Sequence, residues 1–72
     1  MLERTQILSS HIRSVGYDVS QRVLEIEFTS GVIYQYLDVP EKEYKKLMSA
    51  SSYGGYYKKH IIHNYKFRVP QK

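Results

Sequence analysis

A stripe of aromatic and basic side chains near the C-terminus offers the clearest chemistry in this sequence of 72 residues. We expect a helix that starts between residues 53 and 56 and ends near residue 64. One face of this helix, extended to residue 66, carries Tyr56, Lys59, His63 and Lys66. Aromatic rings stack on bases and lysines meet phosphates, so this combination is typical of a contact with single-stranded nucleic acid. A solvated helix face can have the same composition, and both interpretations stay open.

Charge is distributed unevenly along the chain, whose net charge is +4. Residues 1–43 hold all seven acidic residues and four basic ones, a net charge of −3, whereas residues 44–72 hold seven basic residues and no acid, a net charge of +7. Such asymmetry favours an anionic partner for the C-terminal half. We therefore expect RNA or another phosphate-bearing ligand to meet Lys58, Lys59, Lys66 and Arg68.

Two further tyrosines, Tyr34 and Tyr36, point to the same side of a predicted strand. A three-residue turn over 29–31, with its glycine in third place, would pair Phe28 with Val32 and put both tyrosines on the apolar face. A two-residue turn would put them on the other face, beside two glutamates. We favour the first register, in which the rings fill the core or form a stacking surface on a partly covered sheet.

The elements that must position these residues follow from the hydrophobic pattern. Period-two alternation predicts strands over 12–17 and 23–28, and a third strand carries the two tyrosines. Proline, early acids and three- to four-residue apolar spacing predict a helix over about 40–50, before the second helix. The predicted fold is α+β, a three-stranded antiparallel β-meander followed by two short α-helices packed on one face. Residues 67–70 could form a short extra strand or a packed coil, and the sequence does not decide.

The chain is predicted to be one small domain over residues 9–69, with a loose N-terminal segment over 1–8 and a C-terminal tail over 70–72. No apolar run reaches the roughly 20 residues needed to span a bilayer, and there is no cysteine. We expect a cytoplasmic protein without membrane contact. Its core is small, so homo-oligomerisation would supplement its stability.

Catalytic and metal chemistry find little support in the sequence. Ser51 and Ser52 near His60 lack a recognisable third catalytic group. His60 and His63 lie one helical turn apart, but no cysteine or nearby acid completes a metal site. The pair Gly54–Gly55 matches no phosphate-binding fingerprint and suits a turn between helices. We expect no enzyme activity, no metal and no cofactor.

Several motifs, taken together, resemble the KTSC domain, a short module named for its place at the C-terminus of some lysyl-tRNA synthetases and also found free-standing in bacteria and phages. The resemblance covers residues 9 to about 67. It rests on "VGYD" at 15–18, "LEIEF" at 24–28, Gly31, "YQY" at 34–36, "VP" at 39–40, Tyr44, Leu47 and the run "SASSYGGYY" leading to "HIIHNY". It implies RNA binding, by association with a tRNA-charging enzyme, and transfers no catalytic residue.

The resulting hypothesis is a non-enzymatic module that binds RNA through a basic, tyrosine-bearing C-terminal surface. Its candidate residues are Tyr34, Tyr36, Tyr56, Lys58, Lys59, His63, Lys66 and Arg68. One alternative is a protein-interaction adaptor or homo-oligomer with the tyrosines in its interface. Another is a protein that binds a small phosphorylated nucleotide.

Overall fold

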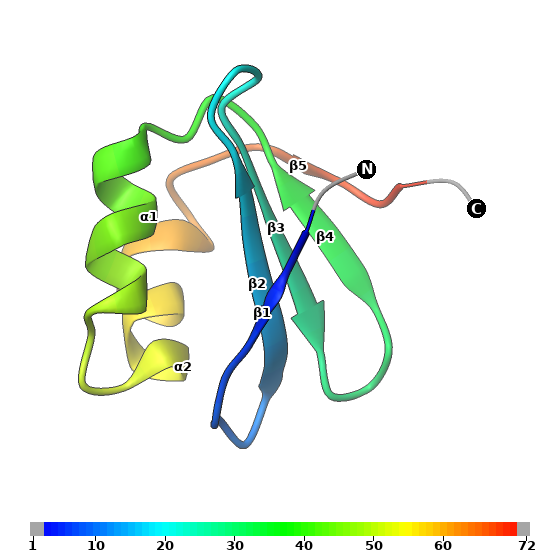
Figure 1. Cartoon of the computed structure of the whole chain (residues 1–72), viewed down its shortest axis with the longest axis vertical. Helices are drawn as coiled ribbons and strands as arrows, with labels where there is room; N and C mark the ends of the chain where they lie inside the picture. The colour runs from blue at the N-terminus through cyan, green and yellow to red at the C-terminus, as the bar shows by residue number, and fades with distance from the viewer. Residues whose placement is uncertain (1–2, 71–72) are drawn as a thin grey trace.

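Alternation of apolar and polar residues produces the central strands of an antiparallel sheet, and two helical segments cover one face of it (Figure 1). This computed structural model describes residues 3–70. The sheet contains five strands in the spatial order of the chain: β1 Thr5–Gln6, β2 Ile12–Asp18, β3 Val23–Phe28, β4 Ile33–Tyr36 and β5 Phe67–Arg68. The helical segments are α1 Glu41–Met48, α2 Tyr53–Tyr56 and a π-helical turn, η1 Tyr57–Ile61, that continues α2.

The predicted α+β class is confirmed, but the prediction of a three-stranded sheet is wrong. β1 lies in the segment that was predicted to be loose, and it pairs with β2. β5 lies in the stretch that the sequence left undecided, and Phe67 pairs with Tyr36 of β4. Each of these strands is only two residues long, too short to show a period-two pattern. The chain therefore forms a four-stranded meander, then both helical segments, then a fifth strand.

The predicted register of the hairpin between β3 and β4 is confirmed. Gly31 adopts a φ of 97°, the left-handed conformation that a three-residue turn requires at its last position. The Phe28 amide donates to the Val32 carbonyl at 2.9 Å, and Tyr34 lies opposite Ile26. The two-residue turn considered as an alternative is excluded. Both tyrosines of β4 therefore face the helices.

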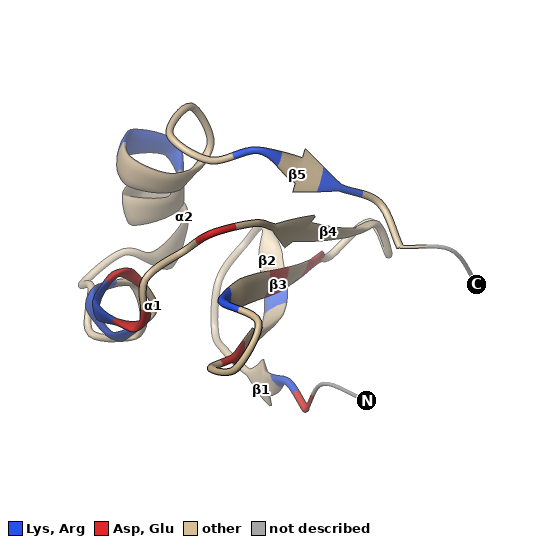
Figure 2. Ribbon diagram, turned by 90° about the horizontal axis from the view of Figure 1, so that it is seen from above, with Lys and Arg blue, Asp and Glu red and all other residues tan. Residues whose placement is uncertain are grey.

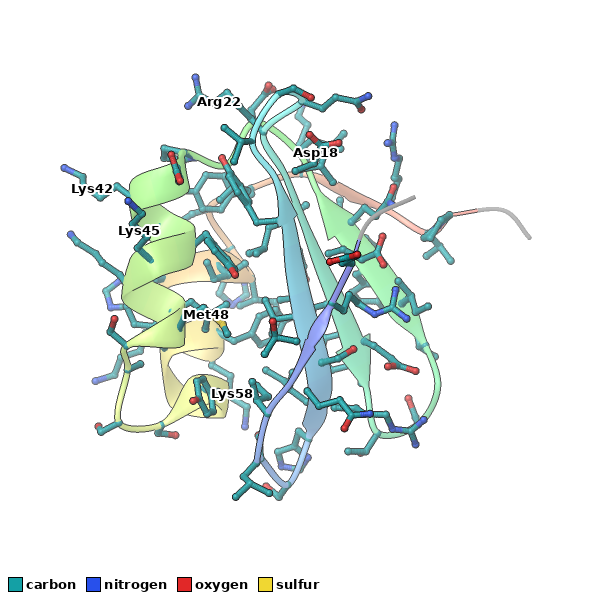
Figure 3. All side chains as sticks on the ribbon, viewed as in Figure 1. Asp18, Arg22, Lys42, Lys45, Met48 and Lys58 are labelled. Atoms are coloured by element: carbon teal, nitrogen blue, oxygen red, sulfur yellow. The ribbon has the colours of Figure 1, made fainter. Side chains whose placement is uncertain are left out.

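The first helix, predicted over about 40–50, is α1, and its apolar side packs on the sheet. Leu47 is fully buried and Tyr44 and Met48 are half-buried, as the spacing predicts. In Figure 3, Met48 points towards the sheet, while Lys42 and Lys45 point away from it.

The second helix is shorter than predicted and changes its winding. Ser52 caps α2 by accepting a hydrogen bond from the Gly55 amide at 3.1 Å, which compensates for the weak helix propensity of the glycine pair. The Ile62 amide donates to the Tyr57 carbonyl five residues earlier, and the helix ends at Ile61 instead of near residue 64.

The two faces of the sheet differ in character. The face under the helices carries the core, which comprises Ile12, Val15, Leu24, Ile26, Tyr36, Val39, Leu47, Tyr57 and Ile61. On the opposite face, Arg4 forms ion pairs with Glu25 and Glu27 of β3. Gln35 donates to Glu25 at 2.7 Å and accepts from Arg68 at 2.8 Å, extending the polar network to β5. The carboxylates of β3 are thus paired within the fold.

Candidate functional site

Most of the basic residues after residue 43 that the structure describes have no acidic partner. Lys45 forms an ion pair with Glu41 at 3.9 Å, and it is the only cation after residue 43 within 4 Å of a carboxylate among residues 3–70. The ribbon of η1, which continues α2, and that of the β5 region carry basic residues without acidic ones, whereas α1 carries both kinds (Figure 2). The charge asymmetry of the sequence is thus retained in the folded chain along η1 and β5.

Two open cavities meet at the start of α2, and we name them together the α2 groove. One, of about 390 Å³, lies between the β1–β2 loop and α2, and the other, of about 270 Å³, lies along α2 and η1. Both are lined by Ser51, Ser52 and Gly55, so they adjoin at these three residues. The other polar and aromatic lining residues are Ser9, Ser10, His11, Tyr53 and Lys58 in the first cavity, and Tyr56, Lys59 and His60 in the second. No aspartate or glutamate is among these described lining residues.

Long-range contacts hold the loop side of the groove in place. The Thr29 amide in the β3–β4 turn donates to the His11 carbonyl at 2.9 Å. Ser9 stiffens the loop itself, because its hydroxyl oxygen accepts from the amides of His11 and Ile12. Lys58 lies at the lower end of the molecule beside α2 (Figure 3). The groove is therefore formed by segments that are about forty residues apart in sequence.

Tyr56 lines the second cavity, and contacts of both its ring and its hydroxyl group fix its orientation. Its ring packs against the His60 ring with centroids 4.4 Å apart and planes inclined at 33°. Its hydroxyl donates to Glu43 Oε2 at 3.2 Å. Burial, and secondly the neighbouring Glu43 carboxylate, raise the pKa of Tyr56 above its usual value. The Tyr56 ring is therefore neutral at neutral pH and is held between the His60 ring and Glu43, in a cavity that Lys59 also lines.

Tyr34 lies in a third, aromatic cavity of about 370 Å³ at the same end of the molecule. Three aromatic residues, Phe28, Tyr34 and Tyr57, line it, and we name it the aromatic cavity. The other lining residues are His11, Thr29, Ser30 and Val32. The Phe28 ring meets Tyr34 and Tyr57 edge to face, with centroids 5.4 and 5.5 Å away. These contacts fix the positions of the three rings.

Tyr36 belongs to the core. It is 1% exposed, so its ring cannot stack on an external base. Its hydroxyl shares a hydrogen bond with the Tyr57 hydroxyl inside the core. Burial raises the pKa of both tyrosines.

The structure brings together only part of the predicted site. Tyr56, Lys58 and Lys59 line the α2 groove, and Tyr34 lines the aromatic cavity. Three other predicted residues are exposed and line neither the groove nor the aromatic cavity: His63, Lys66 and Arg68. The predicted stripe assumed 100° per residue as far as residue 66, but the helix ends at Ile61, so the later positions leave that line. Arg68 bonds to Gln35 on the helix-free face of the sheet.

Sequence reasoning missed the two histidines of the groove as site residues. His60 follows Tyr56 by four residues, a helical spacing that could have identified the pair. His11 carries no such signal, because it reaches the groove through contacts between a loop and a distant turn.

The described part of the chain contains neither a cluster of metal-binding side chains nor a membrane-spanning helix. Within residues 3–70, no three histidine, aspartate or glutamate side chains gather where a metal ion could bind. None of the helices in the same range is long and apolar enough to cross a membrane.

Comparisons with known proteins identify the family. The family model of the KTSC domain matches residues 8–65. An uncharacterised protein of Stutzerimonas stutzeri (strain A1501) is 41% identical over 56 residues, which cover 78% of this chain and 79% of that protein. A protein of Tsukamurella paurometabola is 39% identical over 46 residues, 64% of this chain and 69% of that one. The crystal structure of a KTSC domain protein from Yersinia pestis has a TM-score of 0.94 and 38% sequence identity, and the match covers 99% of this chain and 100% of that one. The chain therefore belongs to the KTSC domain family.

Proposed function

We propose that this protein is a non-enzymatic binding module for RNA, and that the α2 groove meets the phosphates. The observation that supports this proposal most strongly is that Lys58 and Lys59 line a groove whose described lining residues include no aspartate or glutamate. Neither lysine forms an ion pair among residues 3–70. A lysine without an acidic partner retains its full attraction for a phosphate, because no internal ion pair must first be broken.

The other lining groups suit a phosphate as well. The lining residues include four serines, whose side chains carry hydroxyl groups, and His11 and His60, whose side chains carry imidazole rings. Hydroxyl, imidazole and ammonium donors are common partners of phosphate oxygens in nucleic-acid complexes. These contacts carry no base specificity, so the proposal predicts sequence-tolerant binding.

The arrangement of serines and histidines supports a binding role in preference to catalysis. Ser9 and Ser52 use their hydroxyl oxygens to accept hydrogen bonds from backbone amides. Among the hydrogen bonds of residues 3–70, none joins a groove serine to an imidazole, the contact that activates a serine nucleophile. The groove therefore offers donors to an anion without an activated nucleophile.

A titration of fluorescein-labelled single-stranded RNA of mixed sequence tests this function. If two phosphates are neutralised, the affinity should fall roughly sevenfold between about 50 and about 200 mM salt, because log K for a single strand changes by about −0.7 per contact. Fluorescence anisotropy measures both affinities. No salt-dependent binding at tens of micromolar protein would rule the proposal out.

A homo-oligomer is the second candidate, and the edge of the sheet favours it. Phe67 in β5, the last strand of the sheet, is 52% exposed, and Val69, directly after that strand, is 56% exposed. An exposed edge strand with apolar side chains can pair with another chain. Light scattering at two protein concentrations tests this, and a monomer at both would exclude it.

A further inference from the structure

The aromatic cavity and the α2 groove share one residue. His11 lines both, because the loop before β2 lies against the turn between β3 and β4. The Thr29 amide bonds to the His11 carbonyl at 2.9 Å, and the Thr29 hydroxyl to the Ser10 carbonyl at 3.5 Å. An aromatic cavity and a cationic, hydroxyl-lined groove therefore adjoin at a single residue, His11.

The aromatic cavity has the features of a receptor for a flat ring. Three aromatic rings form its walls, and they are held by edge-to-face contacts with one another. Its exposed lining residues include two with hydroxyl groups, Thr29 and Ser30, beside the apolar Val32. Its volume of about 370 Å³ is within the size range of small-molecule sites. Rigid aromatic walls and nearby hydroxyl groups suit a nucleobase, which presents a π-face and polar edges.

From this juxtaposition we infer that the protein binds single-stranded RNA with one base inserted in the aromatic cavity and a neighbouring phosphate in the α2 groove. This inference rests on the function proposed above and adds to it the mode of recognition. In a nucleotide, one ribose separates the base from the phosphate. The two sites share the lining residue His11, so their adjacency suits a base and a neighbouring phosphate of one strand. The paired rings of Tyr56 and His60 line the same groove and would stack against the next base of the strand.

The inference excludes duplex RNA as the preferred ligand. A base in a duplex is paired and stacked, so it cannot enter a cavity without being unpaired first, whereas an unstacked base in a single strand can. Single-stranded RNA should therefore bind more tightly than a duplex of the same sequence.

Amide chemical shifts in the intact protein separate the two sites. The reporters for the aromatic cavity are Thr29, Ser30 and Val32, and those for the groove are Ser51, Ser52 and Lys58. Inorganic phosphate should shift the groove reporters alone, and a mixed-sequence single-stranded hexanucleotide should shift both sets. Groove shifts alone with the hexanucleotide would overturn base insertion and leave phosphate binding intact. No shifts in either set would overturn both proposals.

An abasic ligand and a matched pair of variants sharpen the test. A hexamer of ribose and phosphate without bases should bind about fivefold or more weakly, because stacking on aromatic side chains contributes that much for each base. Tyr34→Leu should weaken binding of the normal hexamer similarly. Tyr65→Leu removes another half-buried tyrosine that lines neither the cavity nor the groove, and should leave affinity unchanged. Equal affinity for both hexamers, or equal loss in the two folded variants, would contradict the inference.

Discussion

At the scale of single residues, Tyr57 joins the core to the proposed binding surface. Its hydroxyl bonds to that of Tyr36, and its ring meets Phe28 in the wall of the aromatic cavity. The two hydroxyl groups satisfy each other away from water, which is the condition for burying polar atoms without a large loss of stability. Because Tyr57 belongs to the core and also lines the aromatic cavity, this side of the cavity has little freedom to move.

This pair predicts a specific loss of stability in alkali. Burial raises the pKa of Tyr36 and Tyr57, so the folded chain holds both protons at a pH where the unfolded chain releases them. Their contribution is fully present below the ordinary tyrosine pKa and is lost as the pH rises above it, by up to about 1.4 kcal/mol per pH unit for each group. Urea unfolding between about pH 9 and about pH 11 measures the slope, since the ordinary tyrosine pKa is about 10.

The double variant Tyr36→Phe/Tyr57→Phe provides the control for that slope. It removes both hydroxyl groups together and leaves neither one unpaired, so it should fold. Its stability should fall less steeply in alkali than that of the original chain. Equal slopes would show that these two hydroxyl groups titrate normally.

At the scale of elements, the edge strand β1 depends on a glycine of its neighbour. A side chain at Gly16 would place its Cβ 2.9 Å from Arg4 Cγ and would also meet the backbone of Glu3. This close approach is what lets the N-terminal segment lie on β2 and bring Arg4 to the carboxylates of β3.

Two glycine-to-alanine substitutions should therefore have opposite effects. Gly16→Ala should destabilise the fold by roughly 1–3 kcal/mol, because the backbone beside it must move to relieve the clash. Gly54→Ala has open space around the new methyl group within a helix, and should stabilise the protein by about 0.5–1 kcal/mol. Urea unfolding measures both changes. A neutral Gly16→Ala would contradict the close packing of β1 on β2.

The elements also show which parts of the fold were predictable. Strands β2 and β3 and the register onto β4 followed from alternation and from Gly31, because local sequence specifies them. The two-residue strands β1 and β5 obtain their order from the strand beside them, and their own sequence carries no period. The end of the second helix was missed for a similar reason, since a π-helical turn leaves little trace in composition.

At the scale of the whole molecule, the fold separates paired from unpaired charge. The helix-free face of the sheet pairs Arg4 and Arg13 with Glu25 and Glu27. The lysines of η1 and the arginine of β5 have no such partners among residues 3–70. The charge asymmetry was readable from the sequence, but the groove was not, because the fold assembles it from a loop, a linker and a helix.

The central claim is that Lys58 and Lys59 meet phosphate because of where they lie, and one comparison tests it most directly. Lys58→Gln/Lys59→Gln removes two charges from the α2 groove, and Lys42→Gln/Lys46→Gln removes two exposed charges from α1, outside it. Anisotropy titrations with the same single-stranded RNA over a range of salt concentrations give the slope of log K for each. The groove variant should lose about 1.4 from the magnitude of that slope, for two contacts at about 0.7 each, and the α1 variant should keep it. Equal losses in the two variants would show that RNA responds to net charge alone, and would contradict a binding site in the groove.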